Sequence, residues 1–150
     1  QSARALIPTV ITQLLAGRSR LSLGSLHPTR DLTFVEDTVA GFVAIAESDQ
    51  TVGEVINIGT GHEISIGDLT ALIARVMDKE VEIETEEKRV RPQKSEVERL
   101  LADHSKATRL TGWKPLYKAH EGFVKALKKT IDWYSEMDNM RFYKHANYNI

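Results

Sequence analysis

Residues 24–37 read GSLHPTRDLTFVED. A polar loop around Pro28 leads to Leu32 and Phe34, whose alternation predicts a short strand just after Arg30. An apolar face at helical spacing then predicts a helix, with two acidic residues at its positive N-terminal end. The residues of that face are Val35, Val39, Phe42, Val43 and Ala46. The stretch therefore predicts a strand followed by an amphipathic helix.

Short strands and amphipathic helices also alternate on both sides of this stretch. Apolar residues at helical spacing predict helices over residues 6–15, 66–76, 106–111 and about 123–134. Alternating runs predict strands over residues 21–23, 55–58 and 81–84. Ser65 and Ser105 are predicted to cap two of the helices. The pattern is that of an α/β protein whose strands are too short and too few for a complete doubly wound sheet.

Composition excludes several classes of function. The chain has 150 residues, 41% of them apolar, and a net charge of −1, so no uniform basic field is present to bind nucleic acid. It has no cysteine, which excludes disulfides and thiolate metal sites. No apolar run reaches the roughly 18 residues of a membrane-spanning helix. We expect a soluble, cytoplasmic protein with one core, and Gln1 reads as though the chain starts inside a longer protein.

The sequence contains no recognisable catalytic constellation. Its one Gly-x-Gly, at Gly59-Thr60-Gly61, lacks the third glycine of a dinucleotide-binding turn and is interpreted as an ordinary turn. No tyrosine is followed by lysine four residues later; Tyr134, for example, is followed at that distance by Asp138. The five histidines have no metal-ligand spacing. We therefore predict no catalytic residue, no metal and no cofactor bound by this chain alone.

Two arginines and one asparagine are candidates for binding an anionic ligand. Arg30 and Arg91 lie next to rigid backbone, and a planar guanidinium suits a diphosphate. From composition alone, a surface salt bridge with one of the 21 acidic residues is the more common role of such an arginine. Asn57 precedes two glycines at a predicted strand end, where it either contacts a base or ribose or forms a turn.

Four segments in register give the chain a family resemblance. Residues 24–37 resemble the "G…RD…VED" signature of the extended short-chain dehydrogenases that act on nucleotide sugars. The other three are VINIG at 55–59, RP with SEV at 91–97, and LTGWKP at 110–115. The details are similar to the 4,6-dehydratase branch, near the GDP-mannose 4,6-dehydratases and the LegB-type UDP-N-acetylglucosamine 4,6-dehydratases. By this resemblance residues 1–150 form the substrate-binding C-terminal domain, with a tail over about 139–150, and the Rossmann half is absent.

The resemblance implies roles for particular residues. Arg30 and Arg91 correspond to arginines that contact the nucleotide diphosphate in the family. Asn57 and Glu96 correspond to residues that line the ribose or base, and Leu6, Leu21 and Leu23 to positions that pack against the base. The family reaction implies NAD or NADP in the complete enzyme, with hydride removed at sugar C4, loss of water across C5 and C6, and hydride return at C6.

Other functions remain open. An epimerase or decarboxylase of the same family shares these binding segments. The chain could also be a stand-alone nucleotide-sugar binding module, or an interaction domain that keeps only the fold. The expected partners are a nucleotide-diphosphate sugar and the missing Rossmann half, and the complete enzyme is expected to be a homo-oligomer.

Overall fold

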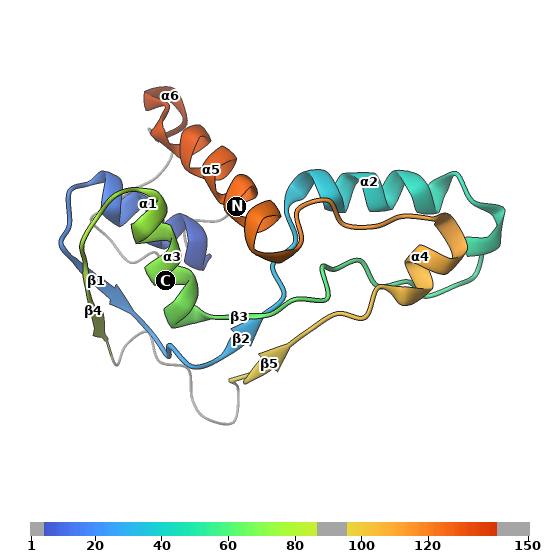
Figure 1. Cartoon of the computed structure of the whole chain (residues 1–150), viewed down its shortest axis with the longest axis horizontal. Helices are drawn as coiled ribbons and strands as arrows, with labels where there is room; N and C mark the ends of the chain where they lie inside the picture. The colour runs from blue at the N-terminus through green and yellow to red at the C-terminus, as the bar shows by residue number, and fades with distance from the viewer. Residues whose placement is uncertain (1–4, 87–95, 141–150) are drawn as a thin grey trace. The chain divides into compact units, whose positions relative to one another are not determined.

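The computed structural model describes residues 5–86 and 96–140 of the chain, as an alternation of helices and short strands (Figure 1). The helices are α1 (Leu6–Leu15), α2 (Val35–Ala46), the 3₁₀ turn η1 (Asp49–Thr51), α3 (Ile66–Val76), α4 (Ser105–Thr111), α5 (Ala119–Ser135) and α6 (Met137–Met140). The strands are β1 (Arg20–Leu23), β2 (Thr29–Arg30), β3 (Ile64–Ser65), β4 (Glu82–Thr85) and β5 (Arg99–Leu100). The α/β class predicted from the sequence is confirmed.

The chain divides into two compact units, which are described separately. Among the described residues, unit 1 contains residues 5–28, 65–86, 96–97 and 127–140. Unit 2 contains Thr29–Ile64 and Glu98–Ala126. No helix in the described part of the chain is long and apolar enough to cross a membrane.

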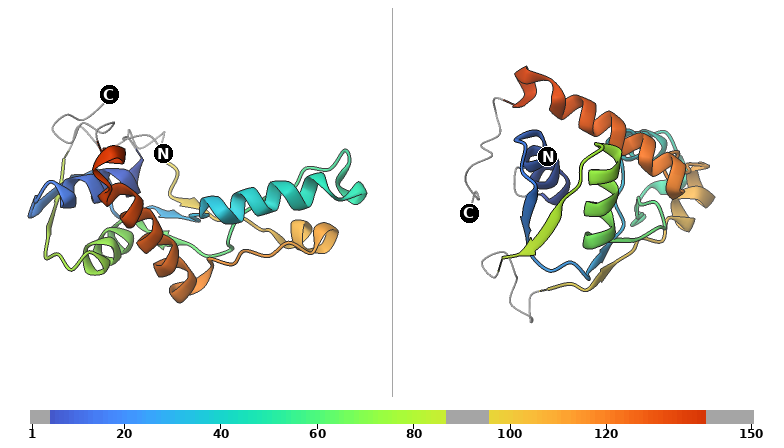
Figure 2. Two further views of the ribbon diagram at one scale, coloured as in Figure 1. Left: turned by 90° about the horizontal axis from the view of Figure 1, so that it is seen from above. Right: turned by 60° about the vertical axis from the view of Figure 1, so that its left-hand side comes forward.

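Unit 1 holds most of the apolar core. β1 pairs in parallel with β4, with Leu21 opposite Ile83, and α1 packs against both β1 and α3 (Figure 2). The Ser65 hydroxyl accepts a hydrogen bond from the Asp68 N–H at 3.0 Å, so the predicted cap of α3 is confirmed. The buried apolar side chains of these elements are Val10, Ile11, Leu14, Leu21, Leu23, Leu69, Ile73 and Ala74.

Unit 2 has a much smaller core. β2 pairs in parallel with β5, β3 lies on the other side of β2, and α2 packs against α4 and η1. The buried apolar residues of the described part of unit 2 are Ala107, Trp113 and Ala126. Gly112 ends α4 in the left-handed conformation at φ 74°, which glycine adopts without strain. Because few apolar side chains are buried in unit 2, hydrogen bonds between its segments contribute a larger share of its stability.

Three sequence-based expectations about elements are wrong. Residues 55–58 form no strand, because they make no ladder with any described segment. The strand expected after Arg30 is instead β2 at Thr29–Arg30, where the Thr29 N–H donates to the Glu98 carbonyl just before β5 and the Asp31 N–H donates to the Leu100 carbonyl within β5. Ser105 is the first residue of α4 rather than its cap, since its own N–H donates to the Asp103 carboxylate at 2.8 Å.

Candidate functional site

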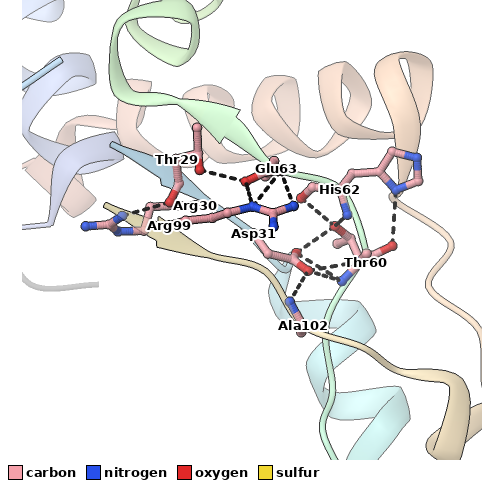
Figure 3. Close-up of polar contacts among 9 residues, drawn as sticks. Thr29, Arg30, Asp31, Thr60, His62, Glu63, Arg99 and Ala102 are labelled. Carbon is pink, nitrogen blue, oxygen red and sulfur yellow. Dashed lines mark hydrogen bonds and ion pairs between the residues drawn. The ribbon is translucent and has the colours of Figure 1, made fainter. Parts of the chain in front are cut away.

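The Asp31 carboxylate is the hub of a polar cluster in unit 2 (Figure 3). It accepts hydrogen bonds from the Thr60 N–H at 3.0 and 3.1 Å and from the Thr60 hydroxyl at 2.6 Å. It also accepts from the Gly61 N–H at 2.9 Å and the Ala102 N–H at 3.3 Å. One side chain, placed at the end of β2, therefore joins the segment after residue 58 to the segment after β5.

Asn57 lines an open depression of about 400 Å³ beside this hub. The walls are residues 56–59 on one side and Leu100–Ala102 on the other, with Asp31 and Thr33 completing the lining. Asn57 is exposed, so its amide is accessible to a ligand in this depression. The hydrogen bonds of Asp31 fix the spacing of the two walls.

Arg30 is half-buried, and its guanidinium lies next to its own strand. Its Nη1 donates to the Thr29 carbonyl at 2.7 Å. Arg30 and Asp31 are consecutive residues of extended backbone, so their side chains point to opposite sides, as Figure 3 shows. The structure thus brings Asn57, but not Arg30, into the lining of the depression.

A second polar cluster joins β2, β3 and β5 on the surface of unit 2. The Glu63 carboxylate accepts from the Thr29 hydroxyl at 2.6 Å and from the Arg99 Nε at 2.8 Å and Nη2 at 2.7 Å. The hydrogen bonds from Arg99, followed by the one from Thr29, lower the pKa of Glu63 to about 2. The pairing of Arg99 with Glu63 in turn raises the pKa of the guanidinium.

We expect Glu63 to titrate near pH 2 rather than near its ordinary value of 4.5. A carboxylate whose folded pKa is depressed stabilises the fold above its unfolded pKa, and this contribution is lost as the pH falls toward about 2. The stabilisation is small because the pair is exposed to solvent. NMR titration of the side-chain carboxyl carbon measures the midpoint. Arg99→Ala should move it back toward 4.5, and a wild-type midpoint already near 4.5 would contradict the assignment.

The turn at Gly59-Thr60-Gly61 does not fit a dinucleotide phosphate. The N–H groups of Thr60 and Gly61 donate to Asp31, so they are not directed at a ligand. A Cβ at Gly59 would lie 2.3 Å from the Ala102 Cβ, so the glycine is needed for close packing within unit 2. Gly61 has φ 71°, the left-handed conformation of a turn. The segment bends at Gly61, and we derive no step through NAD from it.

Asp37 anchors α2 to the segment before α5. Its side chain is 1% exposed, and its carboxylate accepts from the Leu116 N–H at 2.8 Å and the Tyr117 N–H at 2.9 Å. The neighbouring Glu36 accepts from the Tyr117 hydroxyl at 2.6 Å. The acidic pair of the VED segment therefore has a structural role in unit 2.

The remaining predicted site residues are distributed over the chain. Leu21 and Leu23 are buried in unit 1 on β1, and Leu6 is half-buried at the start of α1. Glu96 is half-buried, also in unit 1. Arg91 lies outside the described residues. Within the described ranges no group of histidine and acidic residues is arranged to hold a metal ion.

The two carboxylates that organise unit 2 could not be identified from the sequence. Asp31 lies within the stretch 24–37, but its partners lie 29 to 71 residues further along the chain. Glu63 and Arg99 are 36 residues apart and belong to no shared motif. The pairing of Glu63 with Arg99 therefore cannot be predicted from a single sequence.

Comparison with known proteins identifies nucleotide-sugar enzymes as relatives. The family model described as GDP-mannose 4,6 dehydratase matches residues 1–126. The dTDP-glucose 4,6-dehydratase of Shigella flexneri is 32% identical over 136 residues, covering 86% of this chain and 36% of that protein. The putative UDP-glucose 4-epimerase of Methanocaldococcus jannaschii is 31% identical over 128 residues, covering 85% of this chain and 38% of that protein.

A solved structure shows the same fold. The UDP-glucuronic acid 4-epimerase of Bacillus cereus, in complex with UDP-glucuronic acid and NAD, superposes with a TM-score of 0.76 at 26% identity. The match covers 95% of this chain and 42% of that one. The chain spans well under half the length of each of these relatives.

Proposed function

The chain belongs to the GDP-mannose 4,6-dehydratase family of NAD-dependent nucleotide-sugar dehydratases and epimerases, and from this premise we propose that it binds the substrate of a nucleotide-sugar 4,6-dehydratase. The match of the family model to residues 1–126 carries the proposal. The depression that Asn57 lines in unit 2 supports it, because its walls are held by hydrogen bonds rather than by a large core. The proposed substrate is UDP-N-acetylglucosamine or a similar nucleotide-diphosphate sugar.

Each proposed contact rests on the chemistry of its side chain. Arg30 and Arg91 bind the diphosphate, since guanidinium groups form charged, bidentate hydrogen bonds to phosphate oxygens. Asn57 and Glu96 bind the ribose or base. Leu6, Leu21 and Leu23 form the apolar support for the base, with Leu21 and Leu23 acting from within the core of unit 1. The role of these residues is positioning, which lowers the barrier by holding the reacting carbons in place.

We assign the chemical step to a part of the longer protein that is not in these 150 residues. The chain has no Tyr-x-x-x-Lys pair, and its one Gly-x-Gly is engaged with Asp31. Its relatives are much longer, which leaves room for a Rossmann half that binds NAD or NADP. We propose that the complete protein is a cytoplasmic homo-oligomer and that the 150 residues alone are inactive.

A 4-epimerase is the second candidate, because epimerases are also among the relatives. Incubating the complete protein with NAD and UDP-, GDP- or dTDP-linked sugars separates the two, with the product identified by NMR. A 4-keto-6-deoxy sugar supports the dehydratase, whereas inversion at C4 with retention of the 6-hydroxyl supports the epimerase. Absence of any turnover with all three nucleotides would contradict both.

Arg30→Ala is expected to weaken binding of the nucleotide sugar to the complete protein by about 1.5–3 kcal/mol, the usual strength of a hydrogen bond to a charged group. That corresponds to a rise in KM of roughly 10- to 150-fold, since each tenfold change is about 1.4 kcal/mol. Steady-state kinetics with varied sugar nucleotide measure it. Arg20→Ala is the matched control, because Arg20 pairs with Glu82 on the surface of unit 1. Unchanged KM and kcat in Arg30→Ala would contradict the assignment.

A further inference from the structure

Arg30 lies in a strand whose register its own length specifies only weakly. β2 has two residues, Thr29 and Arg30, and β5 beside it is equally short. The Thr29 N–H donates to the Glu98 carbonyl at 2.8 Å, and the Asp31 N–H donates to the Leu100 carbonyl at 2.7 Å. A slip of one residue in a strand turns every side chain to the opposite face. The direction of the Arg30 guanidinium therefore depends on what keeps β2 in register with β5.

The Glu63 carboxylate lies where the three short strands of unit 2 meet (Figure 3). Glu63 is the residue just before β3, and its Oε2 accepts from the Thr29 hydroxyl of β2 at 2.6 Å. The Arg99 guanidinium of β5 donates from Nη2 to Oε1 at 2.7 Å and from Nε to Oε2 at 2.8 Å. Thr29 and Arg99 are opposite each other in the register of β2 and β5. One carboxylate therefore holds this pair of residues together and joins them to β3.

Arg30 is attached to Thr29 through both its backbone and its side chain. Its Nη1 donates to the Thr29 carbonyl at 2.7 Å, so a displacement of Thr29 also displaces the guanidinium. Thr29 is in turn held by Glu63 through its hydroxyl. The Glu63 side chain is only 28% exposed, whereas the Arg99 side chain is 63% exposed, so the carboxylate is the enclosed centre of this contact.

We propose that Glu63 is a positioning residue for substrate binding, which holds Thr29 in register with β5 and so directs the Arg30 guanidinium at the diphosphate of the nucleotide sugar. This inference rests on the proposed function, in which Arg30 binds that diphosphate. A misplacement of a functional group by about 1 Å is enough to reduce its contribution severely. Glu63 acts through Arg30 rather than by contact with the ligand, because its oxygens are engaged with Thr29 and Arg99.

Calorimetry of the complete protein with UDP, GDP and dTDP tests this role. Glu63→Gln keeps the size of the side chain but loses its charge and replaces one acceptor oxygen with a donor. For the nucleotide that the wild type binds, we expect Kd to rise about 5- to 10-fold, less than in Arg30→Ala, because the guanidinium is still present. Thr29→Val removes the hydroxyl and leaves the pair of Glu63 with Arg99 in place, and it should raise Kd in the same direction.

Glu82→Gln is the matched control. Glu82 is also an exposed carboxylate that pairs with an arginine across two parallel strands, since it accepts from Arg20 at 2.8 Å in unit 1. Its substitution should leave Kd at the wild-type value. Exposed pairs add little to stability, so the unfolding midpoints of Glu63→Gln and Glu82→Gln should both stay close to that of the wild type.

The Arg30→Ala background separates positioning from a general loss of structure. If Glu63 acts through Arg30, then adding Glu63→Gln to Arg30→Ala should change Kd by less than about twofold. Effects of the two substitutions that multiply in the double variant would overturn the proposal. In steady-state kinetics Glu63→Gln should raise KM with kcat unchanged, the result of losing uniform binding. A fall in kcat at unchanged KM would contradict it.

The wild-type protein distinguishes failure of this inference from failure of the proposed function. If it binds none of the three nucleotides, the proposed function fails and the role of Glu63 fails with it. If it binds one of them and Glu63→Gln binds that nucleotide equally well, the positioning role alone is overturned, and the proposed function stands.

Discussion

Asp37→Ala is expected to lower the free energy of unfolding of unit 2 by about 3–4 kcal/mol, because it leaves two partly buried N–H groups without the carboxylate that accepts from them. Those groups belong to Leu116 and Tyr117, and the side chain that accepts from them is 1% exposed. The carboxylate also lies in the first turn of α2, where the helix dipole favours a negative charge. Native-state hydrogen exchange of the amides in α2 and α4 measures the loss.

Glu36→Ala is the matched control for this prediction. It removes the same charge from the same helical turn, but Glu36 is exposed and accepts from a side-chain hydroxyl, that of Tyr117. Its loss leaves no backbone N–H group without its acceptor, so we expect a clearly smaller destabilisation. Similar effects of the two substitutions would mean that the charge at the helix terminus, rather than the anchoring of residues 116 and 117, is what matters.

The helices could be predicted because each has a local cause. α1 and α2 have the residue bounds that apolar periodicity indicates, and α3 begins at the Ser65 cap. α5 carries the predicted apolar residues but begins earlier than they indicate, at Ala119. Strands depend on partners elsewhere in the chain. β1 and β4 have such partners in each other, so their alternating patterns were reliable indicators.

Residues 55–58 show why the prediction of strands fails in the described chain. Their sequence alternates like a strand and their side chains are exposed accordingly, yet no described strand pairs with them. The alternation of apolar and polar residues determines which side each side chain faces, whereas the backbone hydrogen bonds of a sheet require a neighbouring strand. The sequence-based prediction of a strand at residues 55–58 is therefore wrong in the described part of the chain.

The candidate site could be predicted only in part. The resemblance singled out Arg30 and Asn57 because they lie in recognisable segments. It did not reveal that Asp31 fixes the walls around Asn57, because the atoms involved come from three separate segments. Long-range polar contacts of this kind depend on the folded arrangement and leave no periodic trace in a sequence.

Asp31→Ala is expected to destabilise unit 2 by about 3–4 kcal/mol and to impair substrate binding as well, since it leaves several partly buried donors without their acceptor. Two of those donors belong to Thr60, which is 3% exposed. Without the carboxylate the segments at 56–59 and 100–102 lose their common anchor, so the depression that Asn57 lines should widen. Denaturant unfolding measures the first effect, and the KM of the sugar nucleotide in the complete protein measures the second.

Two variants separate the anchoring role of Asp31 from its charge. Asp31→Asn keeps the shape but turns one acceptor into a donor facing N–H groups, so it should recover little of the lost stability. Asp103→Ala removes another loop carboxylate of unit 2, one that is exposed and accepts hydrogen bonds from Ser105, and it should have a much smaller effect. If Asp31→Asn behaved like the wild type, the carboxylate would not be the anchor. If Asp31→Ala lowered stability but left KM unchanged, the depression would not be the substrate site, although the structural role of Asp31 would stand.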